Sequence, residues 1–264
     1  MGYLQPPAIR KDARMVRIDA DPIELNQGPG THLPILGCPR TVLNQLAREI
    51  TDREITAPTA WLEEARTRRD TFRQQCEAAP RTESLHALDI VRAVRTVLTD
   101  DTIFLVDGGN IGQWVHQCLC DRYPGHWLTC GISGVIGYGI PGAMAARALY
   151  PDRPIVLVSG DGSLTFTVAE FETAARQHLP FVAILADDQA WGISLTGHRQ
   201  KYGKGISSEL GPIRFDKMAE AFGARGVRIE TPEQIVPAIQ EGFSASVPTL
   251  IHVPVVRANP AEHM

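Results

Sequence analysis

Residues 155–192 read IVLVSGDGSLTFTVAEFETAARQHLPFVAILADDQAWG, and this stretch decides the fold. Two short apolar runs, Ile155–Val158 and Phe181–Ala186, have the length and composition of buried strands. Between them, apolar residues recur at spacings of three and four, which is typical of a helix packed on one face. The order strand, helix, strand predicts a parallel sheet, because parallel neighbours need such a crossover.

Acidic residues follow both predicted strands. Asp161 lies in a glycine-flanked turn after the first strand, and Asp187 and Asp188 follow the second. Open α/β sheets bind ligands just beyond the carboxyl ends of their strands. Carboxylate oxygens suit Mg²⁺, and the backbone N–H groups of Gly162 and Ser163 at a helix start suit an anion such as a diphosphate. Each feature alone is commonly a plain turn or a solvated loop, but their conjunction favours a site for a metal and a diphosphate.

Two more segments are rich in glycine. Residues 107–110, Asp-Gly-Gly-Asn, follow the predicted strand Thr102–Val106 and precede a helical pattern. Residues 129–142 read TCGISGVIGYGIPG. Glycine costs backbone entropy, so this density indicates a backbone that approaches another group closely. A plain strand-to-helix turn is the simpler interpretation of residues 107–110 taken alone.

Together, these segments resemble the cofactor-binding motif of thiamine diphosphate (ThDP) enzymes, in which Gly-Asp-Gly is followed further along by a pair of Asn. The acetolactate synthase and 2-oxoacid decarboxylase branch resembles this chain most. The resemblance implies an α/β fold, in which a parallel sheet has helices on both faces. It also implies that Mg²⁺ is bound by Asp161, Asp188 and the carbonyl of Ala190. Asp187-Asp188 replaces the family's usual Asn-Asn, which keeps an oxygen ligand but adds negative charge beside a diphosphate.

The resemblance also assigns residues to ThDP. Gly134 would offer its carbonyl to the pyrimidine amino group, and Ile136 would be the apolar side chain that holds the cofactor bent. The turns after the strands would contact the diphosphate. The cofactor-binding residues implied in this way are Gly108, Gly109, Asn110, Ile111, Gly134, Ile136, Asp161, Gly162, Ser163, Asp188, Ala190, Trp191, Gly192 and Ile193.

The chain divides into two expected regions. Residues 1–80 contain too few strands to close a core alone, and the resemblance implies that they are the C-terminal remnant of the family's middle domain plus a linker. Residues 81–264 would be the ThDP diphosphate-binding domain. Within them, Ser84 is expected to cap a helix that runs to Leu98. Residues 194–214 are polar, basic and glycine-rich, and are expected to form a loop that serves as a lid or substrate wall.

Composition limits the other possibilities. A hydrophobic content of 44% and a charged content of 21% are ordinary for a soluble globular protein, and the net charge of −4 argues against a nucleic-acid or membrane partner. The N-terminus is mixed and polar, unlike a signal peptide, and the five scattered cysteines indicate no disulfide framework. A cytoplasmic protein is expected.

The resemblance implies a catalytic subunit that decarboxylates a 2-oxo acid and then transfers the acyl carbanion or releases an aldehyde. The glutamate that activates ThDP is expected on a separate subunit with the pyrimidine-binding domain, assembled as a dimer of heterodimers, and no acid of this chain is assigned that role. FAD binding and the identity of the 2-oxo acid stay open. Two alternatives remain. One is a non-catalytic or regulatory paralogue, which Asp187-Asp188 favours. The other is a nucleotide-binding enzyme of a different class on a similar sheet; it predicts a G-x-G-x-x-G turn, and none occurs after any predicted strand.

Overall fold

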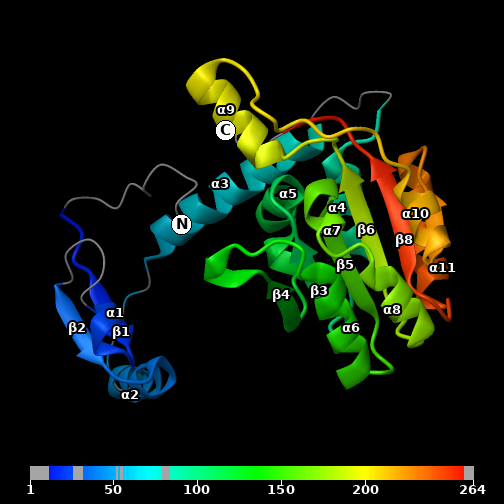
Figure 1. The fold of residues 1–264 in the computed structure, drawn as a ribbon. Coiled ribbons are helices and arrows are strands. Elements are labelled where there is room, and N and C mark those ends of the chain that lie inside the picture. Colours follow the sequence, from blue (N-terminus) through cyan, green and yellow to red (C-terminus); the bar gives the residue numbers. More distant parts are fainter. Residues whose placement is uncertain are drawn as a thin grey trace. The chain divides into compact units, whose positions relative to one another are not determined.

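The computed structural model describes residues 12–25, 32–51, 53, 56, 58–78 and 84–258; for residues 76–78 and 132 it describes only the backbone. The chain forms two compact units, Met1–Phe72 and Arg73–Met264, and each is described by itself. Figure 1 labels their helices and strands.

The first unit has little interior. Strands β1 (Val16–Asp19) and β2 (Leu33–Leu36) pair in parallel, and helices α1 (Pro22–Leu25) and α2 (Pro39–Thr51) accompany them. Among the described residues from 12 to 72, only Leu25 is buried. This observation confirms that the segment does not close a core by itself. Seven large apolar side chains of these elements are exposed: Val16, Ile23, Leu33, Leu36, Leu43, Leu46 and Ile50.

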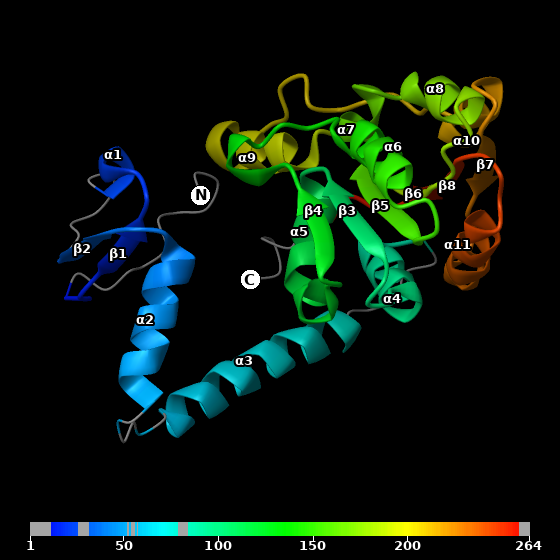
Figure 2. The ribbon, with the colours of Figure 1, turned by 90° about the horizontal axis from the view of Figure 1, so that it is seen from below.

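The second unit is built on one parallel sheet. Within residues 84–258, all of which the structure describes, six strands follow the order β4-β3-β5-β6-β8-β7 (Figure 2), and every neighbouring pair is parallel. The residues of β3, β5 and β6 are almost all buried, as continuous apolar runs in a covered sheet predict. The strands are β3 (Ile103–Asp107), β4 (His126–Thr129), β5 (Ile155–Gly160), β6 (Val182–Asp187), β7 (Arg225–Arg228) and β8 (Thr249–Pro254).

Helices cover both faces of this sheet, which confirms the predicted fold class. Figure 2 shows α6 (Gly139–Leu149), α8 (Glu170–Arg176) and α10 (Phe215–Ala221) on one side of the strands. On the other side lie α4 (Ala87–Val97) and α11 (Ile235–Phe243), which contact each other, and α5 (Asn110–Leu119) packs beside α4. The helix α3 (Thr59–Ala78) contains the sequence boundary between the two units. Shorter elements are α7 (Asp161–Thr165) and the 3-10 turns Cys120–Arg122, Gly131–Ser133 and Pro232–Gln234.

Register brings three strand ends to one edge. Asp107 of β3 is paired with Ser159 of β5, and Ser159 is paired with Leu185 of β6. The turns that follow these three central strands therefore emerge side by side. The predicted site residues of the central motif and of the first glycine-rich turn occupy these turns.

Local expectations are corrected in several places. His86, not Ser84, caps α4: its side chain accepts the Leu88 N–H, and Asp89 completes a capping box. The helix start predicted at Gly162 and Ser163 is confirmed, and it begins at Asp161, the first residue of α7. Strand β4 at the sheet edge was missed, since its apolar residues are half exposed and show no buried run.

The largest correction concerns residues 194–214, which the sequence predicts as a loop. Their first part belongs to helix α9 (Gly192–Tyr202), in which only Leu195 is buried. The helix escaped the sequence pattern because a single buried residue leaves no apolar stripe to detect. It ends at Gly203, which has a left-handed φ of +72°, and irregular backbone follows. In the part of the chain that the structure describes, no helix is both long and apolar enough to cross a membrane.

Candidate cofactor site

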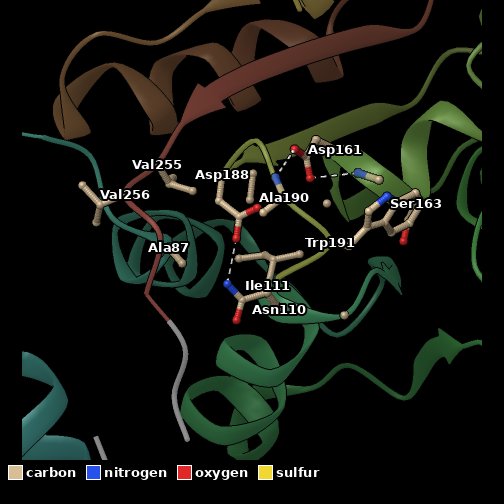
Figure 3. Close-up of a pocket in the computed structure, with 14 residues that line it drawn as sticks. Ala87, Asn110, Ile111, Asp161, Ser163, Asp188, Ala190, Trp191, Val255 and Val256 are labelled. Atoms are coloured by element: carbon tan, nitrogen blue, oxygen red, sulfur yellow. Dashed lines mark hydrogen bonds between the residues drawn. The ribbon is translucent and has the colours of Figure 1, made fainter. Parts of the chain in front are cut away.

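The turns after β3, β5 and β6 line one pocket at the carboxyl edge of the sheet, shown in Figure 3. Strand ends of an open parallel sheet are where ligands bind, so this is the position that the sequence predicted. The tail that follows β8 and the start of α4 complete the wall. The lining residues are Ala87, Gly109, Asn110, Ile111, Gly160, Asp161, Gly162, Ser163, Ala186, Asp188, Ala190, Trp191, Val255 and Val256.

Glycine allows these turns to approach one another. Gly108 has a φ of +137°, and a Cβ there would lie 2.7 Å from the Gly160 backbone nitrogen. A Cβ on Gly162 would lie 2.6 Å from the Trp191 ring. Both positions therefore exclude a side chain, and close backbone approach, predicted from the glycine content, is confirmed here as contact between the turns.

Two buried carboxylates face this pocket. Asp161, 3% exposed, accepts N–H groups from Gly162 at 2.8 Å and from Ala190 at 3.2 Å. Asp188, 8% exposed, accepts the Asn110 side-chain N–H at 2.8 Å. Burial raises the pKa of Asp161 to about 7, with a further contribution from the charge of Asp188. Burial likewise raises the pKa of Asp188, against hydrogen bonds and the charge of Arg257, which lower it.

This donor set fits a hard cation. Two carboxylates that repel each other in a buried site are stabilised when a divalent ion binds between them. Among the described residues, no group of three or more His, Cys, Asp and Glu side chains could hold a metal ion. A cation at Asp161 and Asp188 would therefore need further oxygens from the backbone or from a bound diphosphate, and the Ala190 carbonyl is the predicted one.

The first turn of α5 fits an anion. Gly109 precedes the helix, no side chain caps it, and Gly109, Asn110 and Ile111 line the pocket. The first N–H groups of a helix have no partner inside the helix and attract anions. The Gly162 N–H, also predicted to bind the diphosphate, instead donates to Asp161. Asn110 Oδ1 is buried without a hydrogen-bond partner among the described residues, so the pocket wall has an unused acceptor.

The turn after β6 is held from several sides. Gln189 adopts a left-handed φ of +55°, which is uncommon for a residue with a side chain and needs support from its surroundings. The Arg257 guanidinium donates to the carbonyls of Asp188 at 2.9 Å and Gln189 at 2.8 Å. The Trp191 N–H donates to the Ser208 carbonyl at 2.9 Å. No role of Arg257 was predicted, because nothing in the local sequence of the tail indicates that it folds back on this turn.

Asp107 is a second residue that the sequence analysis missed. It is 2% exposed at the end of β3, and it accepts the N–H groups of Gly137 at 3.0 Å and Gly139 at 2.8 Å. Burial raises its pKa, while these hydrogen bonds lower it. Asp107 thereby ties the glycine-rich segment to the sheet. An acid that ends an apolar strand directly before two glycines was the available signal.

The predicted residues separate into those gathered at the pocket and those outside it. Gly192 lines an adjoining cavity together with Asn110 and Asp188. Ile193 packs against Gly109: a Cβ added to Gly109 would lie 2.9 Å from Ile193 Cδ1. Gly134 is exposed and Ile136 half-buried, and neither lines the pocket. Their contacts with the pyrimidine ring stay predictions.

Asp187 lies apart from the pocket. Its Oδ2 is 2.8 Å from Nε2 of the fully buried His252 on β8, and it is not among the lining residues. Successive side chains of a strand point to opposite faces of the sheet, so Asp187 and Asp188 diverge. Asp187 therefore does not line the pocket, but its charge still contributes to raising the pKa of Asp161 and of Asp188. The expectation that the Asp-Asp pair adds negative charge beside a diphosphate stays a prediction.

Comparisons with known proteins agree with this geometry. The family profile described as "Thiamine pyrophosphate enzyme, C-terminal TPP binding domain" matches residues 107–253, more than half of the chain. Acetolactate synthase of Bacillus subtilis (strain 168) is 32% identical over 69% of this chain and 32% of its own length. The catabolic acetolactate synthase of Raoultella terrigena is 28% identical over 94% of this chain and 45% of its own length.

A relative of another activity matches as well. The 2-hydroxyacyl-CoA lyase 2 of Caenorhabditis elegans is 29% identical over 72% of this chain and 30% of its own length. The chain thus spans less than half the length of these curated relatives. The matched region begins at Asp107 and ends at Val253, and so contains the three turns and both pocket carboxylates. The chain belongs to the thiamine pyrophosphate enzymes and carries their C-terminal TPP-binding domain.

Proposed function

We propose that the pocket at the ends of β3, β5 and β6 binds the diphosphate of ThDP together with Mg²⁺, and that the assembled enzyme acts on a 2-oxo acid. ThDP supplies a carbon nucleophile and an electron sink for decarboxylation. In this chain, Asp161, Asp188 and the Ala190 carbonyl would hold the cation. The first turn of α5 would hold the diphosphate oxygens.

One observation carries the proposal: a pair of buried carboxylates, Asp161 and Asp188, lies beside an uncapped helix N-terminus. Buried charges are costly unless they are paired. A metal diphosphate brings positive charge to the carboxylates and negative charge to the helix start. A metal diphosphate thus accounts for both the buried carboxylate pair and the uncapped start of α5.

The names of the relatives support a reaction class. Acetolactate synthases and a 2-hydroxyacyl-CoA lyase match over most of this chain. We infer that the assembled enzyme removes CO₂ from a 2-oxo acid and either transfers the acyl unit to a second carbonyl compound or releases an aldehyde. The residues of this chain would position the cofactor and exclude water beneath it, where Ile136 and Trp191 offer apolar surface.

We further propose that activity needs a separate subunit with a pyrimidine-binding domain, in a dimer of heterodimers. No acid of this chain is assigned the role of activating the pyrimidine ring. Val135 in the glycine-rich segment and Phe166 after α7 are 57% and 62% exposed, which is apolar surface suited to a partner. In the first unit, the exposed apolar side chains of β1, β2 and α2 also suit burial against further structure.

A non-catalytic paralogue is the alternative. Its support in the sequence was the Asp187-Asp188 pair, which adds negative charge at the predicted diphosphate site. The pairing of Asp187 with His252 weakens that support, because only Asp188 lines the pocket, although the charge of Asp187 still acts on Asp161 and Asp188.

Calorimetric titration of ThDP with Mg²⁺ tests the proposal, using the chain alone and then with its co-expressed partner subunit. Asp161→Ala should weaken binding by roughly a hundredfold, because a buried ligand to the cation is lost. Asp100→Ala is the matched control, since its side chain is 99% exposed and it precedes β3, whereas the pocket turn follows the other end of that strand. Absence of binding by the wild-type complex would favour the non-catalytic alternative.

A further inference from the structure

A polar side chain, that of His252, lies within the buried strand β8. His252 of β8 is fully buried among apolar neighbours, with the ring of Phe215 set edge-on at 5.5 Å. Its Nε2 lies 2.8 Å from Asp187 Oδ2, and its Nδ1 lies 3.3 Å from Asp216 Oδ1. A buried imidazole is retained only when its nitrogens have partners, and here both partners are carboxylates.

Basic groups complete this arrangement. Arg214 donates to both oxygens of Asp216, at 2.9 and 2.7 Å, and Arg228 Nη1 lies 3.3 Å from His252 Nδ1. We call Asp187, Arg214, Asp216, Arg228 and His252 the His252 cluster. It joins α10, β7 and β8 to the last residue of β6 on the α10 side of the sheet.

Nε2 is the donor toward Asp187. Nδ1 has both an arginine donor and a carboxylate acceptor within 3.3 Å, so it is satisfied with or without a proton. A carboxylate only accepts, so the short contact to Asp187 requires the proton on Nε2. The hydrogen bond to Asp187 is therefore the fixed member of the cluster.

Asp187 transmits this restraint to the turn that follows. Its Oδ1 accepts the Gln189 N–H at 3.2 Å, and its carbonyl accepts the Val255 N–H at 2.9 Å. Gln189 holds its left-handed φ between these contacts, and the next N–H, of Ala190, reaches Asp161. A strained residue persists only where its surroundings determine its conformation.

We propose that His252 is a positioning residue for the cation site: through Asp187 it locks the turn 187–190 in the conformation that presents Asp188 and the Ala190 carbonyl to the metal. The metal itself rests on the proposed function, whereas the locking of the turn does not. Asp187 is thus an anchor on one face of the sheet, and its neighbour is the ligand on the other. Residues that hydrogen-bond to metal ligands commonly contribute ten- to a hundredfold to metal affinity, and His252, which acts one contact further away, is expected near the lower end of that range.

Matched variants of His252 test the anchor. The amide of His252→Gln can occupy the place of Nε2 and donate to Asp187, whereas the shorter amide of His252→Asn reaches only the place of Nδ1. Amide hydrogen exchange of the cofactor-free full chain should show residues 189 and 190 exchanging roughly tenfold faster in His252→Asn, and His252→Gln should restore most of the protection. Circular dichroism checks that both variants are folded.

Titration of the assembled protein with Mg²⁺ at saturating ThDP provides the second measurement. Affinity should fall about tenfold or more in His252→Asn and recover largely in His252→Gln. Asp187→Ala removes the acceptor and should cause the same faster exchange and weaker Mg²⁺ binding that are expected of His252→Asn. It keeps the anchor testable if His252→Asn does not fold. Asp187→Asn keeps an acceptor oxygen for His252, so it should not tighten Mg²⁺ binding. If Asp187 acted instead by repelling the diphosphate, removing its charge should tighten Mg²⁺ binding.

The outcomes separate the two proposals. Equal exchange and equal Mg²⁺ affinity in His252→Asn and His252→Gln would overturn the anchor, and so would tighter binding by Asp187→Asn. If no variant and no wild-type complex binds ThDP, the proposed function fails, while the exchange measurement still decides the role of His252.

Discussion

Two groups of acids lie on opposite faces of the sheet at the end of β6, and they differ in their partners. On the α10 side, Asp216 is paired with Arg214 and His252, and these contacts lower its pKa. On the pocket side, burial and mutual repulsion raise the pKa of Asp161, and burial raises that of Asp188. Acids with built-in basic partners serve the fold, and buried acids that lack them indicate a ligand.

The largest effect is expected from removing a paired acid. Asp216→Ala removes the buried carboxylate that accepts two hydrogen bonds from Arg214 and contacts His252, and should lower the free energy of unfolding by about 2 kcal/mol. Urea denaturation of the full chain measures this change. Asp100→Ala, at an exposed position, should stay within about 0.5 kcal/mol of wild type. An Asp216→Ala variant as stable as the control would show that the paired acid on the α10 side does not stabilise the fold.

The next largest effect is expected from removing Arg257, a basic side chain on the pocket side of the sheet. Arg257 donates to two carbonyls of the turn after β6, and its charge lowers the pKa of Asp188. Arg257→Ala should weaken Mg²⁺ binding about tenfold at saturating ThDP, measured by calorimetry. Arg257→Lys should behave more like Ala than like Arg, because an ammonium cannot reproduce the fork of donors.

The matched control for this prediction is Arg199→Ala. Arg199 borders the adjoining cavity but contacts Glu209 at 3.6 Å rather than the turn. A loss of affinity as large as that of Arg257→Ala would show that general positive charge, not the two carbonyl contacts, supports the site.

Removing an unpaired acid should act in the opposite direction. In the metal-free chain, Asp161→Asn should raise the free energy of unfolding by about 1 kcal/mol, because a buried charge that repels Asp188 is neutralised. Thermal or urea denaturation without Mg²⁺ measures the difference. Destabilisation by Asp161→Asn would mean that the two pocket acids support the fold, like Asp216.

The smallest effect is the pH dependence of that gain. Asp161 has a folded-state pKa of about 7, above its ordinary value of 3.8, so the folded chain holds the proton more tightly than the unfolded chain. Metal-free wild type therefore loses stability as the pH rises from about 4 to 7. The advantage of Asp161→Asn should vanish near pH 4 and be complete above pH 7, in denaturation curves across this range. An advantage that does not change with pH would exclude the charge as its cause.

Much of the fold was predictable because its signals are local. The apolar runs at 155–158 and 181–186 became β5 and β6, and the fold class followed from the crossover between them. Thr231-Pro232 is a sequence typical of a helix start, and Thr231 does form a capping box at that point. Helix α9 was missed because its stability depends on one buried leucine rather than on a stripe. The assignment of residues 1–80 to a truncated middle domain stays a prediction.

The site was predictable by position but not by orientation. Asp161 and Asp188 were placed at adjacent strand ends, and the structure brings them to one pocket. The buried histidine within TLIHVP was a visible signal, since a polar residue in an apolar strand requires partners. Its partners, Asp187 and Asp216, are distant in sequence, and no local pattern connects them.

The sequence by itself determined that this chain has a parallel sheet with a glycine-rich, acidic edge, because strand length, alternation of elements and turn chemistry are local properties. Only the tertiary structure decided which acid of the Asp187-Asp188 pair borders the pocket. The two residues are chemically identical, and their roles diverge because neighbouring side chains at a strand end point to opposite faces. On one face the packing of α10 and β8 supplies a histidine, and on the other it leaves a pocket.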